Sequence, residues 1–278
     1  MSENLREQEL IESRLNKLQK WQAQGFEAYP STLERSHTNQ EALDQFDSLA
    51  ESKQLLHLVG RLRSLRGHGG STFAHIEDGT ARLQVYFRKD ELGQEKFEQT
   101  KQLDIGDFVG VSGTLFTTHT GEPTLLISAY QLLSKSIRPL PTEFYGLKDS
   151  ETKLRKRYLD FLLNPQVKDR LVKRSIIINT IRKFLIDKGF IEIENPFLEM
   201  SPSGALARPF TTHINAFDLD LYLRICAGEL WHKRSLVGGF EKVFDLGRAF
   251  RNEGVDFEHN PEFTMLEFYW AFASLDQN

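Results

Sequence analysis

Charged and aromatic side chains cluster around two apolar segments near the end of the 278-residue sequence, 243–250 and 263–272. Both segments are rich in Val, Leu, Phe and Tyr, which favours β-strands. The polar stretch between them ends at Pro261 and predicts a long loop, so we expect two antiparallel strands. Side chains alternate between the faces of a strand, so Arg251 and Glu253 would share one face. One face of the second segment would carry Phe263, Met265, Glu267 and Tyr269.

Charges gathered on one face of apolar strands cost free energy unless they pair with each other or bind a ligand. A surface with a guanidinium, two carboxylates, a ring and a phenol therefore suggests a ligand site. The alternative interpretation is a solvated sheet face with one Arg–Glu pair. The opposite parity of the second segment is mostly apolar and predicts a packed core: Thr264, Leu266, Phe268 and Trp270.

The loop between the two segments favours the ligand site. The run from Phe250 to Gly254 (FRNEG) and the run from His259 to Tyr269 (HNPEFTMLEFY) resemble the second signature motif of class II aminoacyl-tRNA synthetases. The residues of this motif are similar to those of lysyl-tRNA synthetases in particular. A motif of this length is far more specific than a lone glycine-rich loop.

The resemblance implies activation of L-lysine by ATP to lysyl-adenylate, followed by transfer of the lysyl group to tRNA(Lys). Arg251 would be the catalytic group, with its guanidinium bridging the lysine carboxylate and the α-phosphate. Glu253 would accept a hydrogen bond from the adenine amino group, and Phe263 would stack on the adenine ring. His259 would approach the outer phosphates, and Asn260 would support the loop's ligand contacts. Catalysis would rest on positioning and electrostatics.

The resemblance also implies a lysine pocket formed by Gly204, Glu229, Arg251, Glu267 and Tyr269. Tyr269 would lie near the ε-ammonium and Glu267 would balance its charge, because a buried ammonium needs a carboxylate. Two departures from the family's wording affect this pocket. Ser203 replaces a glycine and would leave its loop less free to adopt a positive φ. Gly228 replaces a proline next to one extra residue, which could displace Glu229.

The sequence from Leu55 onward has a different pattern, with strand-like segments separated by turns that contain glycine. The strand candidates are 57–62, 72–76, 82–87, 108–115 and 124–133, with a short helical stretch, 91–102, between the third and fourth. Five strands with a helix in this position predict an OB-fold barrel, a common platform for oligonucleotides.

Basic residues and rings along these strands are typical of a nucleic-acid surface, because bases stack on rings and arginines contact phosphates. Phe73 and Tyr86 supply rings, although a core position for Phe73 remains an alternative. In lysyl-tRNA synthetases the corresponding region is the anticodon-binding domain. The resemblance implies a uridine-rich anticodon that would be contacted by Arg66, Phe73, Gln84 and Glu122. The Glu122 carboxylate can only accept, so it would read a donor such as the uracil imino N–H.

The remaining segments organise these two regions. Apolar periodicity predicts helices over 5–24 and near 39–50, and Asn164-Pro165 predicts the start of a long helix that ends at Gly189. That helix and the expected strand 190–196 resemble the first class II motif, which forms the dimer interface in the family.

We therefore expect an α+β protein with a five-stranded OB-fold barrel, followed by part of a class II synthetase antiparallel sheet flanked by helices. The expected division is an N-terminal helical extension over 1–54, the barrel over 55–135, a linker over 136–150 and an incomplete catalytic domain over 151–278. Only the first and second class II motifs fall within that last region.

Composition places further bounds on function. The net charge of −4 argues against indiscriminate nucleic-acid binding, and a single cysteine, Cys226, excludes an internal disulfide framework and an all-cysteine metal site. Cys226 is expected to be a small buried thiol. No apolar run is long enough to span a bilayer, and the first residues lack the layout of a secretory signal. We therefore expect a cytoplasmic protein without a membrane partner.

The third class II motif, the magnesium-binding acids and a further lysine-pocket acid of the family do not occur in these 278 residues. We therefore expect no metal ligands in this chain, Mg²⁺ binding mainly by residues of a missing C-terminal part, and little or no activity from this chain alone. Three interpretations remain: a truncated lysyl-tRNA synthetase, a non-catalytic tRNA-binding module or degenerate paralogue, and a lysyl transferase acting on a protein. The barrel argues against the third, because such paralogues generally lack it.

Overall fold

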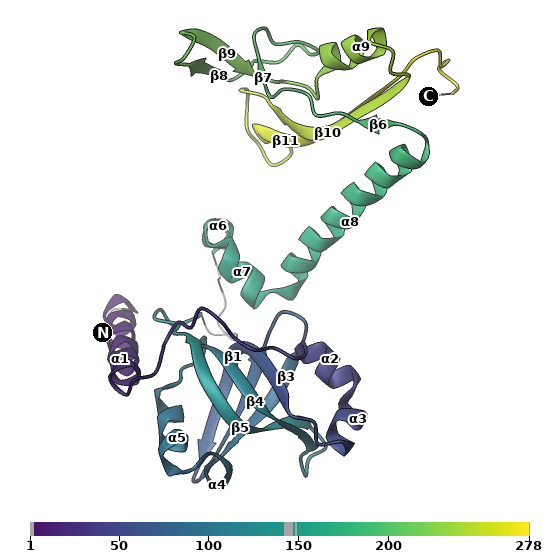
Figure 1. Ribbon diagram of the computed structural model, residues 1–278. Helices are drawn as coiled ribbons and strands as arrows, with labels where there is room; N and C mark the ends of the chain where they lie inside the picture. The colour runs from purple at the N-terminus through teal and green to yellow at the C-terminus, as the bar shows by residue number, and fades with distance from the viewer. Residues whose placement is uncertain (1–2, 142–146, 148, 278) are drawn as a thin grey trace. The chain divides into compact units, whose positions relative to one another are not determined.

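The computed structural model describes residues 3–141, 147 and 149–277 (Figure 1). The chain divides into two compact units, Met1–Leu163 and Asn164–Asn278. Both contain helices and strands, so the predicted α+β class is confirmed.

The N-terminal unit begins with the three helices α1 (Glu3–Ala23), α2 (Asn39–Asp44) and α3 (Phe46–Glu51). The predicted helix over 5–24 is thus confirmed, whereas the one near 39–50 is split at Gln45. Thr38 caps α2 with a reciprocal pair of hydrogen bonds to Glu41, which fixes where that helix starts.

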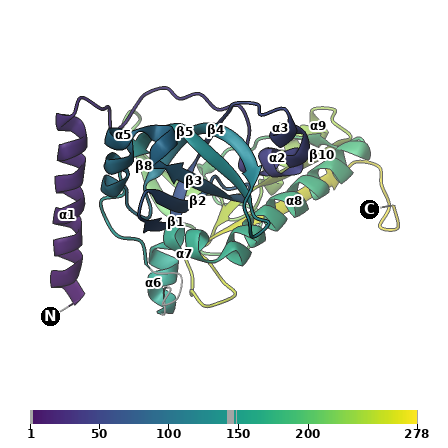
Figure 2. The ribbon, with the colours of Figure 1, turned by 90° about the horizontal axis from the view of Figure 1, so that it is seen from below.

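The strands that follow are β1 (Leu56–His68), β2 (Ser71–Glu77), β3 (Arg82–Arg88), β4 (Phe108–Thr117) and β5 (Pro123–Ser134). They form a closed barrel in the order β1-β2-β3-β5-β4, which is visible from a second side in Figure 2. Between β3 and β4 lie α4 (Lys89–Leu92), α5 (Gln94–Gln99) and the 3-10 helix η1 (Thr100–Gln102). The five predicted strands and the helical stretch between the third and fourth are confirmed.

The barrel core follows from the alternation of side chains along its strands. In β2, buried and partly buried residues alternate from Ser71 to Glu77, and the buried set includes Ala74 and Ile76. Phe73 has the opposite parity and is partly exposed on the outer face. The alternative that placed Phe73 in the core is therefore excluded.

A buried ionic cluster connects α1 to the barrel. The Lys135 ammonium lies 2.5 Å from an oxygen of Asp104 and 2.8 Å from an oxygen of Asp107. Lys17, on α1, reaches the other Asp104 oxygen at 2.6 Å, while Arg14 donates to main-chain carbonyl groups nearby. Burial alone would raise the pKa of Asp104, but the hydrogen bonds and charges of Lys135 and Lys17 outweigh it and hold that pKa below its usual range.

Replacing Asp104 with Asn is expected to lower the free energy of unfolding of the N-terminal unit at pH 7 by about 1–3 kcal/mol. A carboxylate with a lowered folded pKa stabilises the fold above its unfolded pKa of about 3.9 and loses that effect as the pH falls through the folded value. The difference between the unaltered chain and the variant should therefore shrink below about pH 4. Hydrogen exchange of the barrel strands in increasing urea, at pH 7 and at pH 3, measures this difference in the free energy of unfolding. Asp90→Asn, on exposed α4, is the matched control, and an equal loss in both variants would contradict the prediction.

The helices α6 (Ser150–Arg155) and α7 (Arg157–Leu163) group with the N-terminal unit. The second unit therefore starts at Asn164, whereas the predicted catalytic domain starts at 151. Part of the predicted linker, residues 142–146 and 148, lies outside the described residues. The finer domain boundaries stay predictions.

The C-terminal unit contains one long helix, α8 (Pro165–Asp187), a shorter helix, α9 (Glu229–Val237), and two small sheets. One sheet has the order β11-β10-β6, with β6 at Ile191–Glu192, β10 at Lys242–Phe250 and β11 at Glu262–Trp270. The other has the order β7-β9-β8, with β7 at Leu198–Glu199, β8 at Thr211–Ile214 and β9 at Leu219–Leu223.

The predicted hairpin is confirmed, because β10 and β11 pair antiparallel along their whole length. Leu266 and Trp270 pack against a core of Leu185, Phe190 and Phe244, as their parity predicts. The strand expected over 190–196 is only two residues long, since the chain turns away from β10 after Glu192.

One expectation about the site is wrong. β10 ends at Phe250, so Arg251 and Glu253 lie in the loop beyond the strand and not on one of its faces. They are carried by the chain where it leaves the sheet, and their positions follow from loop contacts and not from strand parity.

The interior of the C-terminal unit contains a buried arginine. Arg224 donates to a carboxylate oxygen of Asp245 at 2.6 Å and to the main-chain oxygen of Arg248 at 2.7 Å, and its guanidinium carbon lies 4.3 Å from the centre of the Phe197 ring. A Cβ on Gly247 would overlap the guanidinium, so only glycine fits there. The arginine thus joins the two sheets of this unit.

No helix among the described residues is both long enough and apolar enough to cross a membrane.

Candidate functional site

Arg251 and Phe263 lie together at the loop end of the β10–β11 hairpin. The guanidinium carbon of Arg251 is 5.2 Å from the centre of the Phe263 ring. The Nε atom of Arg251 donates to the Ile225 carbonyl at 3.2 Å, and its main-chain N–H donates to Pro261 at 2.9 Å. These contacts fix the main chain and the Nε atom of Arg251, so the two terminal guanidinium nitrogens can donate to a ligand.

Glu253 contacts a different part of the same unit. One of its carboxylate oxygens accepts a hydrogen bond from the main-chain N–H of Arg208 at 2.9 Å, and Asn252 donates to the Arg208 carbonyl at 2.7 Å. The loop after β10 is thereby tied to the stretch that follows Gly204 in sequence.

The predicted phosphate-contacting residues lie in the exposed loop between β10 and β11. The Nδ1 atom of His259 lies 2.9 Å from an oxygen of Asp256, and that carboxylate also accepts the main-chain N–H of His259 at 2.7 Å. Hydrogen bonds from Glu258 and His259 hold the pKa of Asp256 below its usual range. Asn260 is exposed beside them. The structure orients His259 within the loop and does not bring it against Arg251.

The phenol of Tyr269 lies in acidic surroundings. Burial raises the pKa of Tyr269 to about 12, and the charges of Glu229, Glu267 and Cys226 add to the effect. Glu267 also accepts a hydrogen bond from the Ala227 N–H at 3.2 Å. Glu229 pairs with Lys233 one turn along α9. A phenol in acidic surroundings suits an ammonium group, because the phenol oxygen can accept a hydrogen bond and the carboxylates can balance the charge.

The sequence analysis did not identify His232, which forms the wall behind this phenol. The buried His232 ring stacks on Tyr269, with ring centres 4.9 Å apart and an angle of 15° between the planes. Its Nδ1 atom lies 2.8 Å from the Gly228 carbonyl, one helical turn back. The available signal was the position of His232 in the first turn of a short helix, which does not indicate its neighbour on another strand.

Gly204 is a position where a side chain cannot be accommodated. Its φ is +91°, and a Cβ there would overlap the Cys226 sulfur and lie 2.8 Å from Glu229. The Cys226 thiol is buried, as predicted, and donates to the Ser203 carbonyl at 3.1 Å. Burial raises the pKa of this thiol.

The two departures from the family's wording have a structural account. Ser203 is not among the residues with positive φ, so the loop does not need a glycine at that position. Gly228 takes up the extra residue in a left-handed conformation, with φ +88° and ψ 48°, and a Cβ there would lie 2.7 Å from the Asn195 side chain. Glu229 then starts α9 and stays beside Gly204 and Tyr269. The expected displacement of Glu229 stays a prediction.

The predicted anticodon residues share the outer face of the barrel. Arg66, Phe73 and Tyr86 are register partners across β1, β2 and β3, and the Phe73 and Tyr86 rings stack at 4.2 Å with 10° between their planes. Two residues from Tyr86 along β3, Gln84 is buried and donates to Thr124 at 2.8 Å. The exposed Glu122 lies at the turn before β5. The structure therefore brings these predicted residues to one surface without assigning their ligand.

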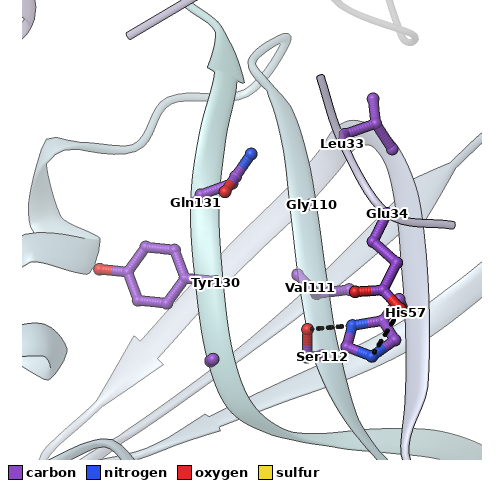
Figure 3. Close-up of a pocket in the computed structure, with 9 residues that line it drawn as sticks. Leu33, Glu34, His57, Gly110, Val111, Ser112, Tyr130 and Gln131 are labelled. Carbon is purple, nitrogen blue, oxygen red and sulfur yellow. Dashed lines mark hydrogen bonds and ion pairs between the residues drawn. The ribbon is translucent and has the colours of Figure 1, made fainter. Parts of the chain in front are cut away.

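A separate hollow of about 240 Å³ opens elsewhere on the barrel, between the chain at Leu33–Glu34 and strands β1, β4 and β5 (Figure 3). In this hollow His57 lies 2.8 Å from the Ser112 hydroxyl and 3.7 Å from a Glu34 oxygen (Figure 3). None of the predicted site residues lines it.

No group of three or more His, Cys, Asp or Glu side chains in the described part of the chain could hold a metal ion. These residues therefore do not fit a Mg²⁺ site.

Comparison with known proteins supports the two-part organisation. The family described as class II tRNA synthetases (D, K and N) matches residues 149–277, and the OB-fold nucleic acid binding domain matches residues 56–133. The segment 149–277 therefore matches the class II tRNA synthetases, and the segment 56–133 matches the OB-fold nucleic acid binding domains.

Several curated relatives of this chain carry the name lysine–tRNA ligase. The chain is 48% identical to the one from Carboxydothermus hydrogenoformans over 265 residues, which covers 95% of this chain and 54% of the relative. It is 49% identical to that of Pelotomaculum thermopropionicum, with 95% and 52% covered, and 46% identical to that of Halalkalibacterium halodurans, with 98% and 55% covered. The chain thus spans about half the length of the curated relatives it matches.

Proposed function

We propose that this chain supplies the anticodon-binding barrel and the first part of the catalytic domain of a lysine–tRNA ligase, which activates L-lysine with ATP and transfers it to tRNA(Lys). The observation that carries the proposal is the site around Tyr269, whose ring stacks on the buried His232 and whose phenol feels the charges of Glu229 and Glu267. A lysine side chain brings an ammonium group that both acids can stabilise. The identity to lysine–tRNA ligases over 95% of the chain supports the same assignment.

Arg251 would provide the charge for the activation step. The lysine carboxylate attacks the α-phosphate of ATP, pyrophosphate leaves, and negative charge gathers on the phosphoryl oxygens in the transition state. A guanidinium fork can hold the carboxylate and the phosphate together, which both orients them and stabilises that charge. Phe263, beside Arg251, would stack on adenine, and Glu253 would accept from its amino group. Gly204 would let its loop close on the substrate, while His259 and Asn260 would meet the outer phosphates.

The remaining elements fit the same proposal. Apolar residues on α8 are exposed in the isolated chain: Leu171, Val172, Ile176, Ile177, Phe184 and Ile186. A second copy would cover such a surface, so we propose a homodimer. We also propose a cytoplasmic location, where translation takes place, and Mg²⁺ binding through residues beyond those present here.

Lysine-dependent ATP–pyrophosphate exchange, together with tRNA binding, tests the proposal. Exchange with lysine and not with arginine or ornithine would establish activation by these residues alone. No exchange, together with binding that depends on the anticodon, would support the second candidate below. Absence of both signals would overturn the proposed function for this chain.

The second candidate is a tRNA-binding module without catalysis. It is favoured by one observation: the barrel closes completely within the described residues, while the chain spans only about half of its relatives. A closed barrel has no unpaired edge and can bind RNA on its own.

Replacing Phe73 with Ala is expected to weaken tRNA binding about 5- to 100-fold, since stacking of one base contributes roughly 1–3 kcal/mol. The ring is partly exposed and stacks on Tyr86, so its removal should leave the barrel core intact. Fluorescence anisotropy with labelled tRNA at fixed ionic strength measures the change. Phe257→Ala, at an exposed ring in the C-terminal unit, is the control. Unchanged affinity in Phe73→Ala would exclude a stacking role for this residue.

A further inference from the structure

Three polar side chains from different elements form a hydrogen-bonded chain on the outer face of the barrel. The Nδ1 atom of His75, on β2, lies 2.8 Å from the Ser64 hydroxyl of β1. Its Nε2 atom lies 3.0 Å from one carboxylate oxygen of Glu122. The His75 side chain is only 15% exposed, whereas Glu122 is 45% exposed. Glu122 therefore faces solvent but is held by a largely covered partner.

The direction of the hydrogen bonds in this chain follows from what each group can do. A carboxylate only accepts, so the Nε2 atom of His75 must donate to Glu122. In the neutral ring Nδ1 is then an acceptor, and the Ser64 hydroxyl donates to it. One oxygen of Glu122 is occupied by the imidazole, and the other can accept from a ligand.

The backbone of Glu122 is fixed as well. Its N–H donates to the Thr118 hydroxyl at 3.0 Å, and its carbonyl accepts from the Thr124 hydroxyl at 3.0 Å. Because the Thr124 proton is used in that bond, Thr124 can only accept from Gln84, at 2.8 Å. Gln84 is a register partner of His75, and its side chain is buried. The surface on this side of the barrel thus presents the Glu122 carboxylate from a fixed backbone position.

We propose that His75 is a specificity-determining positioning residue, which fixes the orientation of the Glu122 carboxylate through one of its oxygens and thereby selects uracil against guanine at the base that Glu122 reads. This inference rests on the proposed binding of tRNA through the barrel.

The selection follows from the edges of the two bases. Guanine presents two neighbouring donors, N1–H and N2–H₂, which a carboxylate with both oxygens available accepts bidentately. Uracil presents a single imino donor between two carbonyl oxygens. A carboxylate that the imidazole holds in one orientation keeps its single bond to uracil through the other oxygen, but it cannot turn to align both oxygens with the two donors of guanine. A bidentate pair discriminates between bases by about tenfold or more, so the effect is large enough to measure.

The chain offers a matched set of variants. In His75→Asn the amide reaches the position of Nδ1 but not that of Nε2, so the contact with Ser64 can persist while the donor to Glu122 is lost. His75→Gln places a donor near the Nε2 position and serves as the conservative rescue. His57→Asn is the control. His57 lies on β1 and also has its Nδ1 atom 2.8 Å from a serine hydroxyl, but it lines the separate hollow (Figure 3).

The experiment uses RNA hairpins with uridine at all three anticodon positions and three variants that each carry one guanosine. Fluorescence anisotropy at fixed ionic strength gives the ratio of dissociation constants for each U-to-G change. For the unaltered chain we expect a preference for uridine at one position at least. His75→Asn should reduce that ratio about tenfold, mainly because the guanosine hairpin binds more tightly. His75→Gln and His57→Asn should keep it within about twofold.

Three outcomes would overturn the proposal. The first is a folded His75→Asn variant that keeps the uridine preference at all three positions, and the second is an equal loss in His57→Asn. The third is a failure of His75→Gln to restore the ratio. Thermal melting by circular dichroism checks the fold, and His75→Thr replaces the Asn variant if that variant does not fold, because threonine favours strands and is too short to reach Glu122. No preference for uridine in the unaltered chain would instead contradict the proposed function.

Discussion

Replacing Arg224 with Met is expected to lower the free energy of unfolding of the C-terminal unit by about 3–5 kcal/mol. The Arg224 side chain is 1% exposed and that of its partner Asp245 is 8% exposed. Methionine fills part of the volume but leaves the Asp245 carboxylate buried without a cation, and such a charge is costly in a medium of low dielectric constant. Because a domain is stable by only about 5–15 kcal/mol, this loss would unfold a sizeable fraction of the unit.

Hydrogen exchange of β10 and β11 in increasing urea reports on this unit separately from the barrel. Arg248→Met is the matched control: Arg248 lies on the same hairpin, 51% exposed, with a single ion pair to Glu262, and its loss should cost less than about 1 kcal/mol. The double variant Arg224→Met/Asp245→Leu should recover most of the loss, since it removes both charges. Equal stability of Arg224→Met and Arg248→Met would show that the buried pair does not support the fold.

The sequence was sufficient for the elements whose pattern is local. The β10–β11 hairpin was predictable because apolar strand residues flank a polar loop that Pro261 closes, and α8 because Pro165 opens its first turn. The barrel was predictable because five short strands with one helical insertion have few compact arrangements. In each case neighbouring residues carry the information.

The position of the site residues was harder to predict from the sequence, because the ends of strands depend on tertiary contacts. Parity placed Arg251 and Glu253 on a strand face, yet the ladder stops at Phe250, where the main chain turns to bond with Pro261 and Arg208. Parity applies only while the ladder continues. Glu253 accepts a hydrogen bond from Arg208 and Arg251 donates one to Ile225, so each contact joins segments more than 20 residues apart, which no local pattern encodes.

The supporting residues were not predictable for a related reason. Arg224 stands in an ordinary strand sequence, and His75 alternates with core residues like any other outward position. Their roles depend on Asp245 and Glu122, which come from different elements. A single sequence shows the residue type and not the partner, so buried ion pairs and side-chain relays emerge only from the folded chain.

Replacing Arg251 with Met is expected to weaken binding of a non-hydrolysable lysyl-adenylate analogue about 100-fold. The guanidinium is anchored through Nε to the Ile225 carbonyl and lies over the Phe263 ring, so its remaining N–H groups are aimed without further loss of conformational freedom. Two charge-assisted hydrogen bonds to the analogue would contribute about 1.5 kcal/mol or more each, and methionine can supply neither. Isothermal titration calorimetry measures the dissociation constant.

Two controls separate charge from geometry at this position. Arg251→Lys keeps the positive charge but loses the planar fork, so it should recover only part of the affinity. Arg248→Met removes an exposed arginine three residues away and should leave affinity within about twofold. If Arg251→Lys bound as tightly as the unaltered chain, a point charge would be enough and the bridging role would be wrong. If Arg251→Met bound equally well, the adenylate would have to lie elsewhere, and the neighbouring roles proposed for Glu253 and Phe263 would fall with it.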